Sequence, residues 1–130
     1  MVLVDTSVWV DFFKGTQTSQ VSILEDLIQF EEDLCISGVI LAEVLQGIQS
    51  DIDYRETLDY FEALIYLPMG QSSFVLASTL HRGARRMGLT IRSTIDCLIA
   101  ACAIHHSVPL LQNDRDFQAI ARCSRLKLLV

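Results

Sequence analysis

Short apolar runs and longer amphipathic segments alternate along the whole chain. The run Val2–Val4 is rich in β-branched residues and uninterrupted, which is typical of a short buried strand. The segment Gln20–Glu31 instead places its apolar side chains three and four positions apart, the spacing of a helix with one buried face. These two periodicities divide the rest of the sequence in the same way.

The alternation predicts an α/β fold. Strands are predicted at Val2–Val4, Leu34–Ile36, Ile65–Leu67, Pro109–Leu111 and Leu126–Val130. Helices are predicted at Ser7–Lys14, Gln20–Glu31, Val39–Ile48, Ile52–Leu64, Phe74–Met87, Ser93–His106 and Asp114–Ala121. We expect a single domain over residues 1–130, with a mainly parallel twisted sheet of four to five strands, helices on both faces and Val2–Val4 at the centre. Binding sites in such sheets form beyond the carboxyl ends of the strands.

Composition restricts where the protein acts. Hydrophobic residues make up 51% of the chain and mean hydropathy is +0.37, which indicates a dense core, a partner-covered surface, or both. No apolar run reaches the roughly 18 residues that a membrane-spanning helix needs. The N-terminus has neither a basic stretch nor a cleavage pattern, so we expect no signal peptide and a cytoplasmic protein.

The cysteines are interpreted as packing residues. None of them forms a Cys-x-x-Cys pair, and two lie in an apolar helical run, which disfavours a disulfide or zinc role. They are Cys35, Cys97, Cys102 and Cys123.

Acidic side chains follow the predicted strands. Asp5 comes directly after the first strand, Asp114 after the fourth, and Asp96 in the first turn of the Ser93 helix, all at the carboxyl edge of the sheet. Each aspartate has an alternative role as a helix cap, because Asp5 or Asp114 can begin a helix and Ser93 with Asp96 matches the capping-box pattern. Glu43 has no such explanation, since it lies within an apolar helix where an unpaired carboxylate is unfavourable.

Taken together, the acids indicate a metal site. Clustered carboxylates raise each other's pKa and destabilise a fold, and a divalent cation removes that penalty. Ligation by oxygen alone favours Mg²⁺ or Mn²⁺ over zinc. Such ions bind phosphates and activate water for attack on a phosphodiester.

The charge distribution leaves the substrate open. A net charge of −6 argues against nonspecific nucleic-acid binding, although carboxylates held on a metal weaken that objection. Arg82, Arg85 and Arg86 share one helix face and Arg92 follows shortly after them. This face is either a solvated surface or a contact for phosphates that leads toward the acids.

Four segments together resemble PIN domains, and among these the VapC-type toxins of bacterial toxin–antitoxin pairs. The segments occur in the order of the family's motifs and are Val4–Ser7, Ala42–Val44, Thr94–Ala100 and Asn113–Phe117. The resemblance implies a metal-dependent endoribonuclease with an RNA substrate, a co-expressed antitoxin and a homodimeric state. It implies ligand or metal-water roles for Asp5, Glu43, Asp96 and Asp114, with Asp116 as a further acidic position.

The same resemblance suggests residues that support the acidic site. The hydroxyl of Thr6 or Ser7 would hold the first aspartate, and Gln112 stands where many relatives carry a small hydroxyl or another polar group. The substrate side is assigned to Thr6, Ser7, Asn113, Arg92, Arg82, Arg85 and Arg86.

Other interpretations remain. Asp114 and Asp116 fit the Asp-x-Asp pair of a phosphatase-like hydrolase, but Ser7 stands where a dehalogenase-like enzyme would carry its second aspartate. A catalytically idle binding module is disfavoured by the intact acids. Trp9, with Phe12 and Phe13, is either core or one wall of a groove for an antitoxin helix. The histidines, His81, His105 and His106, are not expected to be catalytic.

Overall fold

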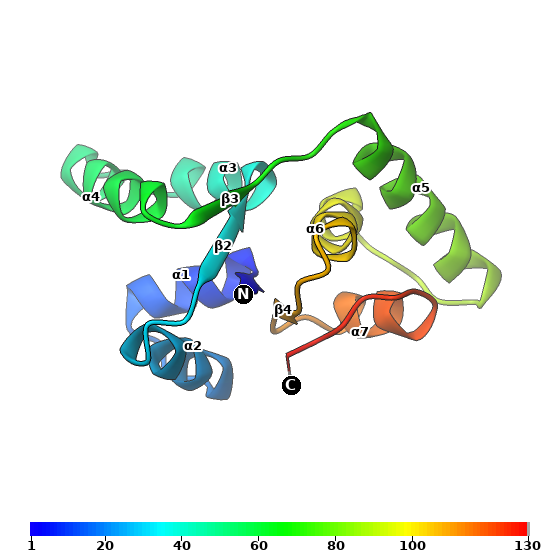
Figure 1. Cartoon of the computed structure of the whole chain (residues 1–130), viewed down its shortest axis with the longest axis horizontal. Helices are drawn as coiled ribbons and strands as arrows, with labels where there is room; N and C mark the ends of the chain where they lie inside the picture. The colour runs from blue at the N-terminus through cyan, green and yellow to red at the C-terminus, as the bar shows by residue number, and fades with distance from the viewer. Residues whose placement is uncertain (130) are drawn as a thin grey trace.

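Four short strands pair in parallel at the centre of the computed structural model, which describes residues 1–129 (Figure 1). They are β1 (Val2–Val4), β2 (Leu34–Ser37), β3 (Ile65–Leu67) and β4 (Leu110–Leu111). The sheet order is β3-β2-β1-β4, with Leu3 paired to Cys35 on one side and to Leu110 on the other. The prediction that β1 is a central strand is therefore confirmed, and all pairs are parallel.

The helices form two layers. They are α1 (Thr6–Lys14), α2 (Ser19–Gln29), α3 (Gly38–Gln46), α4 (Asp51–Glu62), α5 (Gln71–Arg86), α6 (Thr94–His105) and α7 (Arg115–Arg122). From β1 the chain adds β2 and then β3 on one side, and after β3 it crosses the sheet to form β4 on the other side of β1. Because such connections are right-handed, the helices that precede β3 and those that follow it lie on opposite faces of the sheet. Figure 1 shows α1 to α4 on one side and α5 to α7 on the other.

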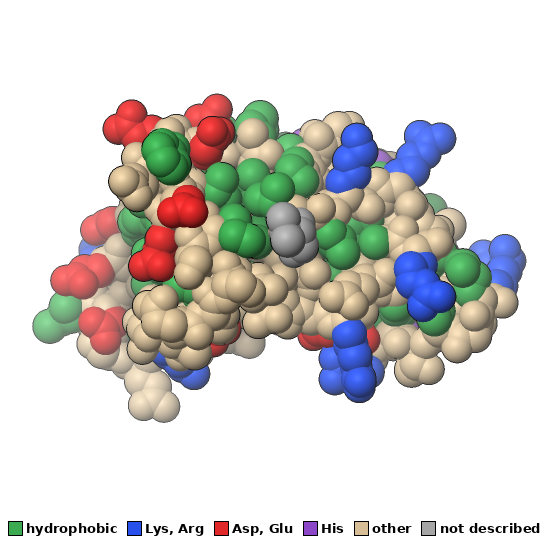
Figure 2. Space-filling view, turned by 90° about the horizontal axis from the view of Figure 1, so that it is seen from below, with side chains coloured by type: hydrophobic (Ala, Val, Ile, Leu, Met, Phe, Trp, Pro, Cys, Tyr) green, Lys and Arg blue, Asp and Glu red, His purple; other side chains and the backbone are tan. Residues whose placement is uncertain are grey.

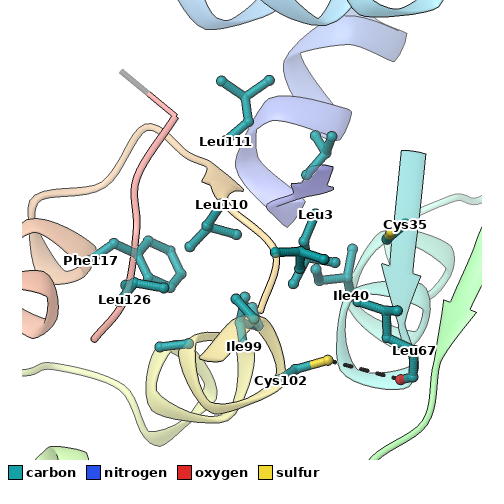
Figure 3. Close-up of a cluster of buried hydrophobic side chains, with 14 of the residues drawn as sticks. Leu3, Cys35, Ile40, Leu67, Ile99, Cys102, Leu110, Leu111, Phe117 and Leu126 are labelled. Atoms are coloured by element: carbon teal, nitrogen blue, oxygen red, sulfur yellow. Dashed lines mark hydrogen bonds between the residues drawn. The ribbon is translucent and has the colours of Figure 1, made fainter. Parts of the chain in front are cut away.

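The core lies between the sheet and α6. Helix α6 is apolar nearly all round, and it packs against α5, α7 and α3 as well as against the sheet (Figure 3). Ile99 and Cys102 face the strands in Figure 3, and the Cys102 thiol contacts the carbonyl oxygen of Leu67 at 3.9 Å. All four cysteines are free thiols, and burial raises the pKa of Cys97 and Cys102 to about 11. Their expected role as reduced packing residues fits this environment.

An aromatic cluster joins α1 to α4. Trp9 is fully buried and contacts Phe61 edge-on with ring centroids 5.2 Å apart, while Phe13 stacks on Trp9 at 5.8 Å. Tyr60 completes the cluster from α4. The core interpretation therefore holds for Trp9, whereas Phe13 remains 43% exposed at the edge of the cluster.

Two predicted boundaries are wrong. The expected strand at Leu126–Val130 is reduced to an isolated parallel bridge between Leu128 and Leu110, because β4 turns into the α7 cap after Leu111 and offers no longer partner; Val130 lies outside the described residues. Helix α5 begins at Gln71, three residues before the predicted start, after a Gly70 cap that makes no side-chain hydrogen bond. None of the helices in the described part of the chain is long and apolar enough to cross a bilayer.

Candidate active site

Asp5 lies where β1 ends and α1 begins. Its carboxylate accepts hydrogen bonds from the Ser7 hydroxyl at 2.7 Å and from the Ser7 backbone N–H at 3.3 Å, so it caps α1. The side chain is nearly buried, and burial raises its pKa against the lowering effect of the Ser7 bonds, with Glu43 raising it further. Capping and a role in the acidic cluster therefore coexist at this residue.

Glu43 reaches the same place from α3. The Thr6 hydroxyl donates to Oε1 of Glu43 at 2.7 Å, which fixes this carboxylate beside the start of α1. The hydroxyl gives the half-buried glutamate the partner that its apolar surroundings do not supply. The two hydroxyls that follow Asp5 therefore bind different carboxylates: Ser7 donates to Asp5, and Thr6 donates to Glu43.

Asp114 begins α7 just beyond β4. Its Oδ1 accepts the backbone N–H of Asp116 at 2.9 Å, and its own N–H donates to Oε1 of Gln112 at 2.6 Å. Gln112 is buried, and its side chain ties the loop after β4 to the cap of α7. The sequence did not reveal this positioning role, because a lone glutamine after a strand carries no burial signal.

Asp96 projects from the first turn of α6. The Ser93 hydroxyl accepts the N–H of Ile95 at 3.1 Å, and within residues 1–129 no hydrogen bond engages the Asp96 carboxylate. The capping-box alternative therefore does not explain this acid. One ligand oxygen from each of Asp96, Asp114 and Asp116 lies within 4.8 Å of the others.

Burial and the charges of four other acids both raise the pKa of Asp96. It is raised to about 7, first by burial and then by the charges of Asp114, Asp5, Asp116 and Glu43. These carboxylates come from four separate segments of the chain. Asp96, Asp114 and Asp116 form the tight group, and the charges of Asp5 and Glu43 also reach Asp96.

Arg92 is the cation already present at the site. Its Nη2 contacts Oδ1 of Asp114 at 3.0 Å, and its Nε contacts Oδ2 of Asp116 at 3.2 Å. The Arg92 backbone N–H also donates to Oδ2 of Asp116. Asp116 is buried and Arg92 is 56% exposed, so the arginine neutralises a buried carboxylate from the solvent side, and Asp116 in turn raises the pKa of Arg92.

The other residues assigned to the substrate side are exposed. Arg82, Arg85 and Arg86 lie on the outer face of α5, and the first two border a groove of about 530 Å³ between α5 and the start of α6. Asn113 lies in the loop before α7, with no side-chain hydrogen bond inside the described region.

The histidines at the end of α6 have structural partners. His105 Nδ1 lies 3.0 Å from the Ser73 hydroxyl, and His106 Nε2 lies 2.8 Å from the carbonyl oxygen of Pro68. Both contacts are at the end of α6 opposite Asp96. The expectation that these residues stay outside the chemistry fits their positions.

The acidic cluster has the chemistry of a divalent-cation site. Its donors are carboxylate oxygens only, a set that hard divalent cations prefer. The Asp96 carboxylate, free of hydrogen bonds within residues 1–129, is available as a ligand. Its pKa is raised first by burial and then by the neighbouring negative charges, whose repulsion a bound cation would relieve.

Comparison with known proteins identifies the family. The PIN domain family model matches residues 2–122. The chain belongs to the PIN-domain family. Over 129 residues, it is 34% identical to the ribonuclease VapC11 of Mycobacterium tuberculosis and to the VapC ribonuclease Mb1587 of Mycobacterium bovis, covering 98% of this chain and 96% of each relative.

Solved structures show the same fold. VapBC2 of Rickettsia felis, determined with a DNA fragment from its promoter, matches this PIN domain with a TM-score of 0.76 at 24% identity, over 98% of this chain and 97% of that chain. At these identities the likeness concerns the fold, and it confirms the predicted sheet with helices on both faces.

Proposed function

We propose that this PIN domain, taken as residues 1–130, is a metal-dependent endoribonuclease and the toxin of a toxin–antitoxin pair. The observation that carries the proposal is the acidic cluster, in which one oxygen from each of Asp96, Asp114 and Asp116 lies within 4.8 Å of the others. Burial, together with the charges of the neighbouring acids, raises the pKa of Asp96 to about 7. The relatives named as VapC ribonucleases, at 34% identity over nearly the whole chain, support ribonuclease activity and its place in such a pair.

The metal ligands in this proposal are Asp5, Asp96, Asp114 and Asp116, and Glu43 is the fourth catalytic acid beside Asp5, Asp96 and Asp114. Mg²⁺ or Mn²⁺ is the expected ion, because every donor is a carboxylate oxygen. When bound, it supplies the Lewis-acid chemistry that activates water and neutralises charge on a phosphodiester.

The protein's own residues prepare this site. Ser7 and Thr6 fix the orientation of Asp5 and Glu43 through hydrogen bonds of 2.7 Å each. In this proposal Glu43 orients the attacking water and accepts its proton, and the Thr6 bond, which engages only Oε1, supports that role because it leaves the second carboxylate oxygen free. The N-terminal N–H groups of α6 and α7 face the same edge and favour a phosphate there.

The RNA backbone is held by exposed cations. Arg82, Arg85 and Arg86 offer one basic helix face, and Arg92 and Asn113 lie at the acids themselves. Half of the Arg92 side chain is accessible, so it can keep its carboxylate contacts while it meets a phosphate oxygen.

An antitoxin helix is proposed to occupy the groove between α1 and α4. This groove, of about 720 Å³, is lined by the aromatic rings of Phe13 and Tyr60, by the acids Asp53 and Glu56, and by one basic residue, Lys14. Such a lining fits an amphipathic helix with basic side chains. A Klebsiella pneumoniae toxin–antitoxin complex has the same fold, with a TM-score of 0.72 at 19% identity over 90% of each chain.

A homodimer is proposed through the free edge of the sheet. β3 is an edge strand, and Tyr66 on it is 55% exposed. Phe74 and Val75 at the start of α5 are exposed by 51% and 57%. An open strand edge and exposed apolar side chains are both features that proteins usually cover. Free thiols at all four cysteines agree with action in the reducing cytoplasm, where the RNA is found.

The test is RNA cleavage by the purified chain with Mg²⁺, with Mn²⁺ and with excess EDTA. We expect internal cleavage with either ion and none with EDTA. Asp96→Asn should abolish cleavage, while Asp59→Asn, which removes an exposed acid from α4, should not. Hydrolysis of a simple phosphomonoester without RNA cleavage would favour a phosphatase, and a folded chain inert toward both would indicate a binding module.

A further inference from the structure

The two helical layers carry opposite charge. Residues 1–62, which contain α1 to α4, hold 13 of the 16 acidic side chains and two of the ten basic ones. Residues 63–130 hold the other eight basic side chains, and their only acids are Asp96, Asp114 and Asp116. Outside the candidate active site, therefore, the layer of α5 to α7 contains no acidic side chain at all.

This division is visible on the surface. Figure 2 shows Asp and Glu gathered over the part that carries α1 to α4, and Lys and Arg over the part that carries α5 to α7. The net charge of −6 is thus the sum of an acidic half of formal charge −11 and a basic half of +5. The overall charge argued against a nucleic-acid partner, but the local charge of the second half does not.

A groove in the basic half leads to the acids. It measures about 400 Å³ and lies between the segment Leu89–Arg92 and α7, with Asp116 and Arg92 in its wall. The same groove is lined by Arg115 and Arg122. Because Asp116 and Arg92 belong to the candidate active site, a chain lying in this groove passes directly into the acidic cluster.

Within the described residues, 1–129, Arg115 and Arg122 have no acidic partner. Both are exposed, and among residues 1–129 ion pairs are formed by Arg92 only. They stand seven positions apart on α7, which is two turns on one face and roughly 10 Å along the helix. Exposed arginines are often merely solvated, but here two of them flank a groove, point along one helix face and adjoin a site for phosphodiester chemistry.

We infer that this groove is the track by which a single strand of RNA reaches the acidic site, with Arg115 and Arg122 holding backbone phosphates on one side of the bond to be cut. The inference rests on the proposed ribonuclease function. The acidic layer of α1 to α4 repels the strand, so RNA approaches from the α7 side. The lining of the groove carries three arginines, Arg92, Arg115 and Arg122, against one acid, Asp116, and this excess of positive charge favours a polyanion as its occupant.

The test measures binding of a mixed-sequence single-stranded RNA oligonucleotide by fluorescence anisotropy, at several salt concentrations with Mg²⁺. All proteins carry Asp96→Asn, which prevents cleavage. The test variant is Arg115→Gln with Arg122→Gln. The matched control is Arg125→Gln with Lys127→Gln, which removes the same charge from a groove at the far end of α6. Arg115→Lys with Arg122→Lys keeps the charge and checks that any loss is electrostatic.

We expect the test variant to lose two phosphate contacts. Each contact to a single strand contributes about 0.7 to the slope of log affinity against log salt, so the slope should fall by about 1.4 and affinity at 0.1 M salt by roughly 20-fold. The control should lose much less, and the lysine variant should retain most of the affinity. Thermal melting checks that each protein is folded.

Three results would overturn the inference. If the test variant and the control lost RNA affinity equally, the arginines would act only through the overall positive charge and not as a specific track. Unchanged RNA affinity in the test variant would exclude these arginines as contacts. A changed oligomeric state with unchanged RNA affinity would identify the surface as a protein interface. In all three cases wild-type protein that still cleaves RNA leaves the proposed function standing, whereas wild-type protein that neither binds nor cleaves RNA removes the function itself.

Discussion

Replacing Asp96 by asparagine should stabilise the metal-free protein while it destroys the site. In the folded chain Asp96 keeps its proton up to a pKa of about 7, whereas the ordinary value is 3.8. Folding therefore becomes less favourable as pH rises from about 4 to 7, and the whole penalty applies above pH 7. Asparagine carries no charge, so it removes the penalty above pH 7 and changes nothing below about pH 4.

The size of the effect follows from the same pKa. The interval from 3.8 to about 7 corresponds to roughly 4 kcal/mol. Asp96 is only half buried, and solvent screening reduces this to about 1 to 2 kcal/mol. For a chain of this length, that gain raises Tm by about 4 to 8 °C.

The assay is thermal melting in EDTA at pH 8 and at pH 4, with Asp59→Asn as the control that removes an exposed acid. We expect the control to stay close to wild type at both values. At pH 8, saturating Mn²⁺ should then make wild type melt at a higher temperature than Asp96→Asn. Wild type gains stability by binding the ion, whereas Asp96→Asn has lost a ligand. An Asp96→Asn protein that melts at or below the wild-type temperature at pH 8 would refute the crowding of carboxylates and restore a capping role.

Four further outcomes are expected. Thr6→Val should slow RNA cleavage by about 10- to 100-fold while Mn²⁺ affinity, measured by calorimetry, stays close to wild type, since it removes the hydroxyl that holds Glu43; an unchanged cleavage rate would contradict a role for Glu43 in orienting the water. Arg92→Gln should lower Tm in EDTA, because Asp116 then loses its guanidinium partner, and Mn²⁺ should restore much of the loss; equal melting with and without the ion would contradict this. Asp5→Asn retains the α1 cap, as asparagine caps equally well, so circular dichroism should stay native while RNA cleavage disappears. Val75→Glu should shift the chain from dimer to monomer in light scattering, and a wild-type chain that is already monomeric at high concentration would exclude the dimer.

Local signals in the sequence predicted much of the fold and the position of the acids. Strand–helix alternation places Asp5 and Asp114 at one edge of a parallel sheet, and this requires no knowledge of side-chain packing. Roles that depend on contacts between residues far apart in the chain could not be predicted from such local signals. The burial of Gln112 and the approach of Thr6 to Glu43, 37 positions away, depend on how layers meet.

Arg92 illustrates the same limit. The sequence suggested a phosphate contact, but the arginine also neutralises Asp116 across 24 positions of chain. The early start of α5 was missed for a different reason, since Gly70 gives no side-chain cap that a sequence pattern would reveal.

The opposite charges of the two helical layers also make each molecule a strong electric dipole. An acidic half of −11 on one copy and a basic half of +5 on another attract each other head to tail. Such contacts do not close on themselves as a two-fold dimer does, so they can propagate into open chains. Screening at about 0.1 M salt, where the Debye length is about 10 Å, should suppress them. Dilute buffer should therefore produce reversible turbidity that clears on addition of salt, and this behaviour would be independent of metal, RNA and antitoxin.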